Sequence, residues 1–298
     1  MSRVIDAGSK PLPVVLKAVD DELLSSWLSR HARFYSVTGP FFARWLGLGN
    51  IRLATLDHRL SLGQVARLTE KFRCDPVTLV GMTHIDTQDG QVSNLISRGR
   101  APQICFPCAD RYAREGAQGA IPKHWSKAWR ITCPVCSLPF TDTNEHRGSR
   151  ETLLHTTFFD DLWSEAEDGE RIVERFIADG NSIEHSPVSI LQLLLVQTWK
   201  PITDDLEHPI VGWVLGTLFP EFDRCARPIK RRVTHTAIAT LPIEFRPALL
   251  AGLARVLANP AVLENLREAT LFRGQRNFDK FCREANFEPP QAGSLSHQ

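Results

Sequence analysis

The chain has 298 residues, of which 43% are hydrophobic and 23% are charged. This composition is typical of a globular protein with room for two domains, and it excludes an intrinsically disordered chain. With 35 basic and 34 acidic residues the formal charge is +1, so no overall field draws the protein to nucleic acid or to an anionic membrane. Any such binding must come from local patches.

The amino terminus does not resemble a secretory signal, because Arg3, Asp6 and Lys10 interrupt its apolar residues. The longest apolar run, residues 209–219, has roughly half of the ~20 residues that a membrane-spanning helix needs. We therefore expect a cytoplasmic protein with no membrane partner. In a reducing cytosol, closely paired cysteines are more typical of metal ligands than of disulfides.

The first hundred residues predict several short helices. Apolar residues recur at helical spacing over residues 20–33, where Asp20 is the expected N-cap. A second short helix is predicted to end near Gly47 and Gly49. Together they indicate a helical amino-terminal region.

Residues 60–85 have the outline of a helix-turn-helix. Ser61 is placed to cap one helix, and Asp75 to cap another after a brief turn. The side chains predicted to face DNA are Arg67, Lys71, Arg73 and Thr78. Plain packing of two short helices is the alternative, since such pairs are common in helical domains.

Four of the seven cysteines form two Cys-x-x-Cys pairs. Each pair can present two thiolates from a tight turn, and two pairs complete a tetrahedral shell for zinc. The predicted ligands are Cys105, Cys108, Cys133 and Cys136. Four thiolates leave no open coordination position, so the one expected Zn²⁺ is structural and not catalytic. The best strand candidates flank these cysteines.

Other interpretations of the cysteines stay open. Free cysteine is often buried, so the four side chains could simply pack in reduced form. A redox role is a second alternative, although it usually needs only one pair between a strand and a helix. His124, inside the spacer, could replace one cysteine as a ligand, but a lone histidine in a loop is more often structural.

The carboxyl half predicts further helices. Residues 186–200 begin with Ser186 as the expected cap and are apolar on nearly every side, which predicts a central buried helix. Another strong helix is predicted to begin at Pro247 and to end before Asn259. The tail from Pro289 is expected to be disordered.

Charge is uneven in this half. Residues 224–235 carry six basic side chains and no acid. The phosphate-contact candidates in this run are Arg227, Lys230, Arg231 and Arg232. A solvated face is the alternative, since most charge runs are simply solvated.

No sequence motif indicates a catalytic activity. The chain has no glycine-rich phosphate loop, which speaks against an ATPase or a dehydrogenase, and it has no Gly-x-Ser-x-Gly or His-Glu-x-x-His. We therefore expect a protein that is not an enzyme.

The predicted fold class is mainly α. It comprises a helix-turn-helix-like helical region over residues 1–100, a small zinc-ribbon-like module with four cysteines over 101–145, a helical domain over 146–288, and a tail over 289–298.

Two stretches together resemble the TniQ family. They are "DELLSSWLSRHAR", which begins at Asp21, and the Cys-x-x-Cys followed by "HWSKAWRITCP" and "SLPF". The resemblance covers roughly residues 10–145. It implies a helix-turn-helix, zinc-binding modules and a non-enzymatic adaptor that bridges a targeting device to an AAA+ ATPase regulator of bacterial transposition.

The resemblance also implies duplex DNA, an RNA-guided effector complex and a second copy of the chain as candidate partners. The sequence departs from the family pattern at Cys136, where a histidine is common, and it lacks a second downstream Cys-x-x-Cys. We therefore expect one zinc ion.

Two functional hypotheses remain beside an uncharacterised zinc enzyme, which would need a ligand other than cysteine and an open coordination site. In the first, a targeting adaptor uses apolar anchors such as Trp199, Trp213 and Phe219 to bind its partner, although each of these could be a core residue. In the second, a sequence-specific DNA-binding regulator reads a site directly, independent of transposition, and its affinity falls steeply with salt.

Overall fold

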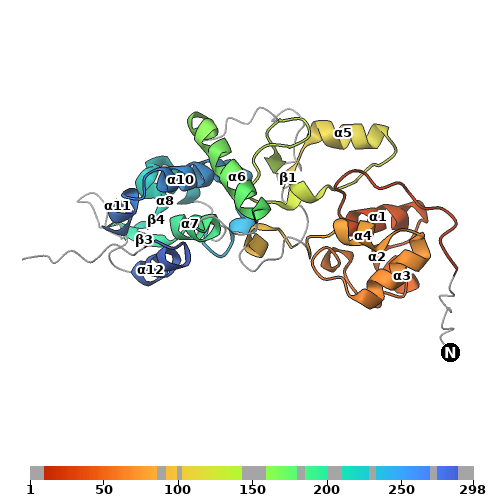
Figure 1. Cartoon of the computed structure of the whole chain (residues 1–298). Coiled ribbons are helices and arrows are strands. Elements are labelled where there is room, and N and C mark those ends of the chain that lie inside the picture. Colours follow the sequence, from red (N-terminus) through yellow and green to blue (C-terminus); the bar gives the residue numbers. More distant parts are fainter. Residues whose placement is uncertain are drawn as a thin grey trace, which may run out of the picture. The chain divides into compact units, whose positions relative to one another are not determined.

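The computed structural model describes residues 10–85, 92–98, 103–142, 159–179, 185–200, 210–227, 233–268 and 274–287. Helices dominate these ranges, and the strands in them form two short antiparallel pairs, β1–β2 and β3–β4, so the predicted mainly α class is confirmed (Figure 1). No helix in these ranges is both long enough and apolar enough to span a membrane.

The chain divides into two compact units. Unit 1 comprises residues 1–127 and 132–145, and unit 2 comprises residues 128–131 and 146–298. The helical amino-terminal region and most of the cysteine segment thus belong to one unit. The finer boundary at residue 100 stays a prediction, and the tail at 289–298 lies outside the described residues.

Unit 1 begins with four helices, followed by the short elements of the cysteine segment. The α-helices are α1 (Leu24–Phe34), α2 (Gly39–Trp45), α3 (Leu62–Phe72), α4 (Pro76–Gly81) and α5 (Phe106–Arg114). The 3-10 helices are η1 (Leu53–Thr55), η3 (Val92–Leu95) and η4 (Lys123–Ser126), and the strands are β1 (Gln103–Ile104) and β2 (Thr141–Asp142).

The apolar faces of α1 to α4 meet in one core, which includes Leu28, Leu68 and Leu79. Helix α1 begins at Leu24, so the expected cap at Asp20 is wrong. Instead, a carboxylate that is distant in the sequence accepts hydrogen bonds from the first turn of this helix. The backbone N–H and the hydroxyl of Ser25 donate to Asp57, at 2.8 and 2.5 Å.

The predicted caps of α3 and α4 are present. Ser61 and Gln64 form a reciprocal capping box at the start of α3, and Asp75 accepts a hydrogen bond from the backbone N–H of Val77 at the start of α4. Arg73, which follows α3, takes a left-handed conformation with φ of 51° and turns the chain sharply. A three-residue turn thus separates the two helices.

Unit 2 contains longer helices. Its α-helices are α6 (Trp163–Ala178), α7 (Pro187–Leu194), α8 (Leu215–Leu218), α9 (Pro220–Ala226), α10 (Arg246–Ala258), α11 (Val262–Glu268) and α12 (Gln275–Glu284). Its strands are β3 (Gln197–Lys200) and β4 (Ile210–Trp213), and its 3-10 helices are η6 (Asp160–Leu162), η8 (Ile238–Thr240) and η9 (Ile243–Phe245).

The predicted helix over residues 186–200 is correct only in its first half. Ser186 caps α7 as expected, but the helix ends at Leu194 and the chain continues as β3, which pairs antiparallel with β4. An all-apolar stretch does not distinguish a buried helix from a buried strand by its pattern, because both need apolar residues on every side.

The predicted helix from Pro247 is confirmed as α10, whose residues are mostly buried. It packs closely on α6, because Gly169 in α6 leaves room for the backbone of Leu250 in α10. This contact is central to the core of unit 2.

Candidate metal centre

The first cysteine pair lies at the start of a helix. Cys105 directly precedes α5, and Cys108 lies in its first turn, after Pro107. The backbone N–H of Cys108 donates to the Cys105 sulfur. A helix amino terminus concentrates unpaired N–H groups and positive potential, which favour the thiolate form of cysteine.

The second pair lies in a tight hairpin. The Cys133 N–H donates to the carbonyl oxygen of Leu138, and the Ser137 N–H donates to that of Cys133, both at 2.8 Å. Ser137 takes a left-handed conformation with φ of 58°, which closes the turn. The backbone N–H groups of Val135 and Cys136 also point to the Cys133 sulfur and donate to it.

These two turns bring the four predicted ligands together. All four Sγ atoms lie within 4.8 Å of one another, with 3.3 Å between Cys105 and Cys136 and 3.7 Å between Cys108 and Cys133. A tetrahedral ion with metal–sulfur bonds of ~2.3 Å needs sulfur atoms about 3.8 Å apart. The cluster therefore fits one tetrahedral metal ion, and strands β1 and β2 close the segment around it.

The four sulfur atoms lie close enough to shift one another's pKa values. The pKa of the Cys133 thiol is lowered to about 3, chiefly by the hydrogen bond with Cys105, and this bond raises the pKa of Cys105. Burial raises the pKa of Cys108 to about 11. A divalent ion would offset the negative charge of the thiolates that ligate it.

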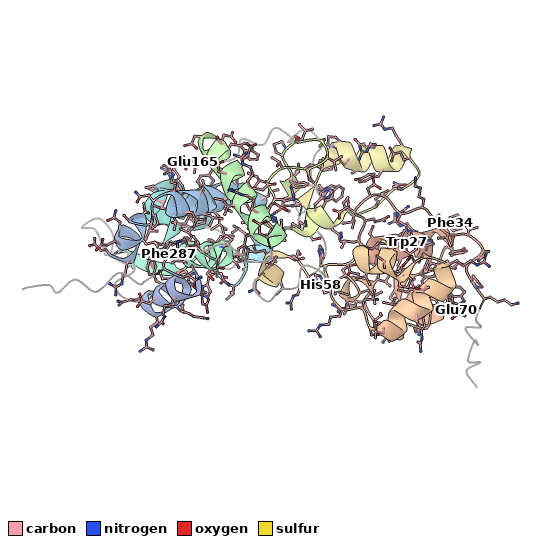
Figure 2. All side chains as sticks on the ribbon, in the orientation of Figure 1. Trp27, Phe34, His58, Glu70, Glu165 and Phe287 are labelled. Carbon is pink, nitrogen blue, oxygen red and sulfur yellow. The ribbon has the colours of Figure 1, made fainter. Side chains whose placement is uncertain are left out.

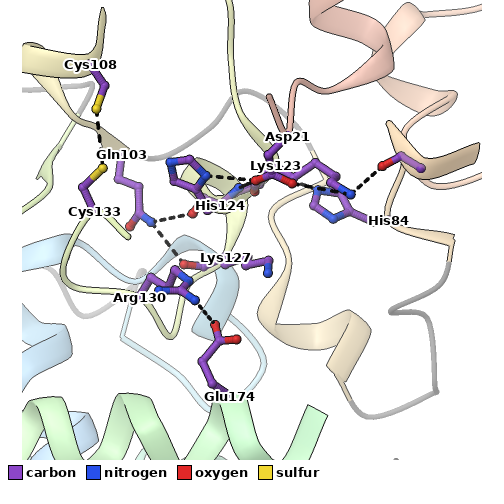
Figure 3. Close-up of polar contacts among 12 residues, drawn as sticks. Asp21, His84, Gln103, Cys108, Lys123, His124, Lys127, Arg130, Cys133 and Glu174 are labelled. Atoms are coloured by element: carbon purple, nitrogen blue, oxygen red, sulfur yellow. Dashed lines mark hydrogen bonds and ion pairs between the residues drawn. The ribbon is translucent and has the colours of Figure 1, made fainter. Parts of the chain in front are cut away.

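His124 supports the cluster from outside. Its Nδ1 lies 2.9 Å from Oδ2 of Asp21, and its backbone N–H donates to the same oxygen (Figure 3). Burial alone would lower the pKa of His124, but the hydrogen bond to Asp21 and the influence of the Cys133 thiolate raise it above its usual value. Since four cysteines already complete the shell, His124 is not needed as a ligand.

The polar residues of the "SSWLSR" string in α1 have a structural role that sequence reasoning missed. Trp27 is labelled in Figure 2, and its indole donates to the carbonyl oxygen of Leu16 at 2.8 Å. Ser26 accepts a hydrogen bond from the backbone N–H of Ile121, also at 2.8 Å. Arg30 forms a buried ion pair with Glu22 at 2.7 Å. These bonds tie the segment before α1 and the loop before His124 to one helix.

The predicted DNA-facing residues have different environments. Arg67, Arg73 and Thr78 are exposed, and the Arg67 guanidinium donates to the carbonyl oxygen of Gly47. The Lys71 side chain is 5% exposed, and its ammonium group lies 5.1 Å from the centre of the Trp45 ring and 3.3 Å from the carbonyl oxygen of Lys10. Three of the four thus lie on the surface.

The candidates in the carboxyl half are only partly described. Arg227, at the end of α9, is exposed, whereas Lys230, Arg231 and Arg232 lie outside the described residues. Among the proposed apolar anchors, Trp213 and Phe219 are buried in unit 2 and do not offer a partner surface. Trp199 lies in β3.

Comparison with protein families gives a match over part of the chain. Residues 13–140 match the TniQ family. Neither a curated protein nor a solved structure matches the chain. The matched range spans the α1–α4 core, the "SSWLSR" string and all four cysteines of the cluster. Over residues 13–140, less than half of its length, the chain is therefore similar to the TniQ family.

Proposed function

We propose that this protein is a non-enzymatic targeting adaptor of a bacterial transposition system, which acts in the cytoplasm and bridges a target-recognition device or a DNA site to an AAA+ ATPase regulator. The observation that carries the proposal is the TniQ match, because it covers the helical core and the cysteine cluster in one continuous range. An RNA-guided effector complex and a second copy of the chain are the further partners of this proposal.

We also propose that the ion of the cysteine cluster is zinc and that it is structural. Zinc accepts four thiolates in tetrahedral geometry, and the sulfur separations suit its bond length. A site with four protein ligands leaves no position for a water or a substrate, which supports a role in folding rather than in chemistry.

The adaptor role is tested by direct binding of the purified, zinc-loaded protein to an AAA+ transposition regulator from the same genome, with and without ATP. We expect micromolar or tighter binding that depends on the nucleotide state of the ATPase. A Cys133→Ser variant should lose it with its metal, whereas Cys74→Ser, at a half-buried cysteine outside the cluster, should keep it. Equal capture of an unrelated AAA+ protein, or no binding in any nucleotide state, would refute the adaptor.

A sequence-specific DNA-binding regulator is the second candidate. It is favoured by the short turn between α3 and α4, which leaves Arg73 and Thr78 exposed near the start of α4. For a direct reader, Thr78→Ala or Arg73→Gln should reduce discrimination between a bound duplex and its mismatched versions by about 1–3 kcal/mol for each base that is no longer read. An adaptor that does not read bases should show no such change.

A further inference from the structure

One buried nitrogen beside the cysteine cluster lacks a hydrogen-bond partner among the described residues. It is Nε2 of His124, whose side chain is only 5% exposed. Buried polar atoms in folded proteins are nearly always hydrogen-bonded, because an unpaired one lowers stability. An acceptor on this side of the ring would remove that cost.

The other nitrogen of the ring is firmly held. Nδ1 lies 2.9 Å from Oδ2 of Asp21, and the same oxygen accepts a hydrogen bond of 3.2 Å from the backbone N–H of His124. The two segments also pair through their backbones. The Lys123 N–H donates to the carbonyl oxygen of Asp21 at 2.7 Å, and the Leu23 N–H donates to that of Ile121 at 2.9 Å. The orientation of the ring is thus fixed from the Asp21 side.

The backbone around this pair is held in place as well. Asp21 takes a left-handed conformation with φ of 58°, which a residue other than glycine adopts only where its surroundings favour it. Gln103 in β1 is fully buried, and its Nε2 donates to the carbonyl oxygens of His124 and Lys127, at 3.2 and 3.1 Å. Since Gln103 lies two residues before Cys105, these bonds connect the histidine to the first cysteine pair.

The unpaired nitrogen faces the second cysteine pair. In Figure 3, Nδ1 is turned to Asp21 and the opposite edge of the ring is turned towards Cys133. His124 also lines one cavity with Pro134 and Val135, which directly follow Cys133. Burial lowers the pKa of His124, whereas Asp21 and Cys133 both raise it, as expected for a ring between two anions. A thiolate at Cys133 is therefore an acceptor on the side where Nε2 has none.

The charge of a metal-loaded cluster makes a donor on this side favourable. Four thiolates carry four negative charges and a divalent ion carries two positive ones, so the centre is left with two negative charges, and three of its four cysteines are buried. Burying net charge is unfavourable unless neighbouring groups offset it. A ring N–H that donates to a ligating sulfur offsets part of this charge and holds the sulfur in position.

We infer that Asp21 and His124 form a positioning pair for the Cys133 thiolate: Asp21 orients the ring, and His124 donates from Nε2 to the sulfur that ligates the ion. The inference rests on the proposed four-thiolate metal site, and it adds to that site a residue from before α1. Asp21 begins the stretch "DELLSSWLSRHAR" and His124 begins "HWSKAWRITCP". The pair thus gives a physical reason for the two stretches to occur in one chain.

The test uses the full-length protein loaded with Co²⁺ in place of Zn²⁺, because a cobalt–thiolate centre has a measurable absorption spectrum. His124→Phe keeps the shape of the ring and removes both nitrogens, whereas His124→Gln keeps one N–H donor near the position of Nε2. The wild type and both variants should show the spectrum of four thiolates in a tetrahedron.

The variants should differ in the band for charge transfer from thiolate to cobalt. In His124→Phe this band should shift to lower energy, because a donor no longer stabilises the electrons of the Cys133 sulfur. His124→Gln should recover part of the shift. The affinity for Zn²⁺, measured by competition with a chelator of known affinity, should fall by about 10–100-fold in His124→Phe.

Asp21→Asn tests the other half of the pair. Asparagine tolerates the left-handed φ and still accepts hydrogen bonds through Oδ1, so this variant should fold. The loss of the carboxylate charge should give a smaller band shift and a smaller loss of affinity than His124→Phe. The matched control is His31→Phe, at a buried histidine in the α1–α4 core that packs on Phe72. Its stability should fall, but its charge-transfer band should not move.

The outcomes separate the positioning pair from the metal site. An unshifted band in His124→Phe, or an equal shift in His31→Phe, would overturn the pair and leave the four-thiolate site intact. A wild-type spectrum of three sulfurs and one nitrogen would make His124 a ligand and overturn both, as would a wild-type protein that binds neither ion. If His124→Phe did not fold, unshifted bands in His124→Gln and Asp21→Asn together would overturn the pair. None of these results depends on the ATPase, so the adaptor proposal stands or falls separately.

Discussion

The two units are stabilised in different ways. In unit 1, polar bonds connect segments far apart in the chain: Asp57 serves the start of α1, Glu22 pairs with Arg30, and the cysteine pairs converge from a helix and a hairpin. In unit 2 the core is aromatic and aliphatic. Trp213 and Phe245 both pack on Phe222, with ring centroids 5.9 and 5.7 Å apart.

Around the cysteines, this difference follows from the shortness of the elements. The elements around the cysteines are short, so they cannot exclude enough water to stay folded by packing alone, and a metal site can supply the missing free energy. Helix α10, by contrast, is surrounded by its own unit on nearly every side. Unit 1 should therefore depend on specific polar groups and unit 2 on close packing.

The largest expected effect is at the metal centre. Cys133→Ser should abolish stoichiometric metal binding and expose the backbone of residues 103–142 to amide exchange, because metal binding and local folding are coupled by about 10 kcal/mol or more. Exchange in α10 should stay as in the wild-type protein. Metal analysis and hydrogen–deuterium exchange by mass spectrometry measure both effects.

Cys74→Ser is the control for this prediction, since Cys74 is half-buried in unit 1 and outside the cluster. If Cys133→Ser kept one metal ion per chain and wild-type protection, the four-thiolate site would be wrong. If the Cys133→Ser variant also lost protection in α10, the two units would not be stabilised separately, contrary to the difference described above.

The second-largest expected effect is a loss of stability in unit 2. Gly169→Ala should destabilise this unit by about 3 kcal/mol, because the new Cβ would overlap the backbone carbonyl of Leu250 and force α6 and α10 apart. Chemical denaturation monitored by the amide exchange of α10 measures it.

Gly63→Ala, in α3, provides the opposite control. A Cβ there meets no atom within 4 Å, so the replacement should stabilise its helix by about 0.5–1 kcal/mol. If the Gly169→Ala variant had the stability of the wild type, α6 and α10 could move apart without a loss of stability. Close packing of these helices would then not be what stabilises unit 2.

The smallest expected effect is a pH dependence of unit 1. Burial raises the pKa of Asp57 from 3.8 to about 7, against the lowering effect of the hydrogen bonds from Ser25. A raised carboxyl pKa means that the folded state holds the proton more tightly than the unfolded state. This carboxyl should therefore reduce the stability of unit 1 as pH rises from about 4 to about 7, and add no further change above that.

The measurement compares wild-type protein with Asp57→Asn, both metal-loaded, between about pH 5 and about pH 8. The stability of the wild type relative to the variant should fall over this interval by about 1–3 kcal/mol, the usual cost of burying a poorly compensated polar group. The comparison cancels the pH dependence of the metal site, which both proteins share. A relative stability that rises with pH would mean that the Ser25 hydrogen bonds outweigh burial at Asp57.

Much of the local structure was predictable from sequence because its causes are local. Ser61, Asp75 and Ser186 cap helices where their positions before apolar periodic runs indicate, and the spacing of the cysteines predicts their convergence. The start of α1 was not predictable, because the Ser25 N–H bonds to Asp57, 32 residues away. The strand β3 was also missed, since apolar residues on every side suit either a helix or a strand.

The sequence by itself determined the helical class, the four-cysteine cluster and the likeness of residues 13–140 to the TniQ family, because spacing and periodicity are properties of neighbouring residues. Only the tertiary structure decided that the polar residues of the α1 string face inward and that Trp213 is buried. Periodicity shows which face of an element is apolar. It does not show which distant segment packs on that face. The burial of a side chain depends on that segment.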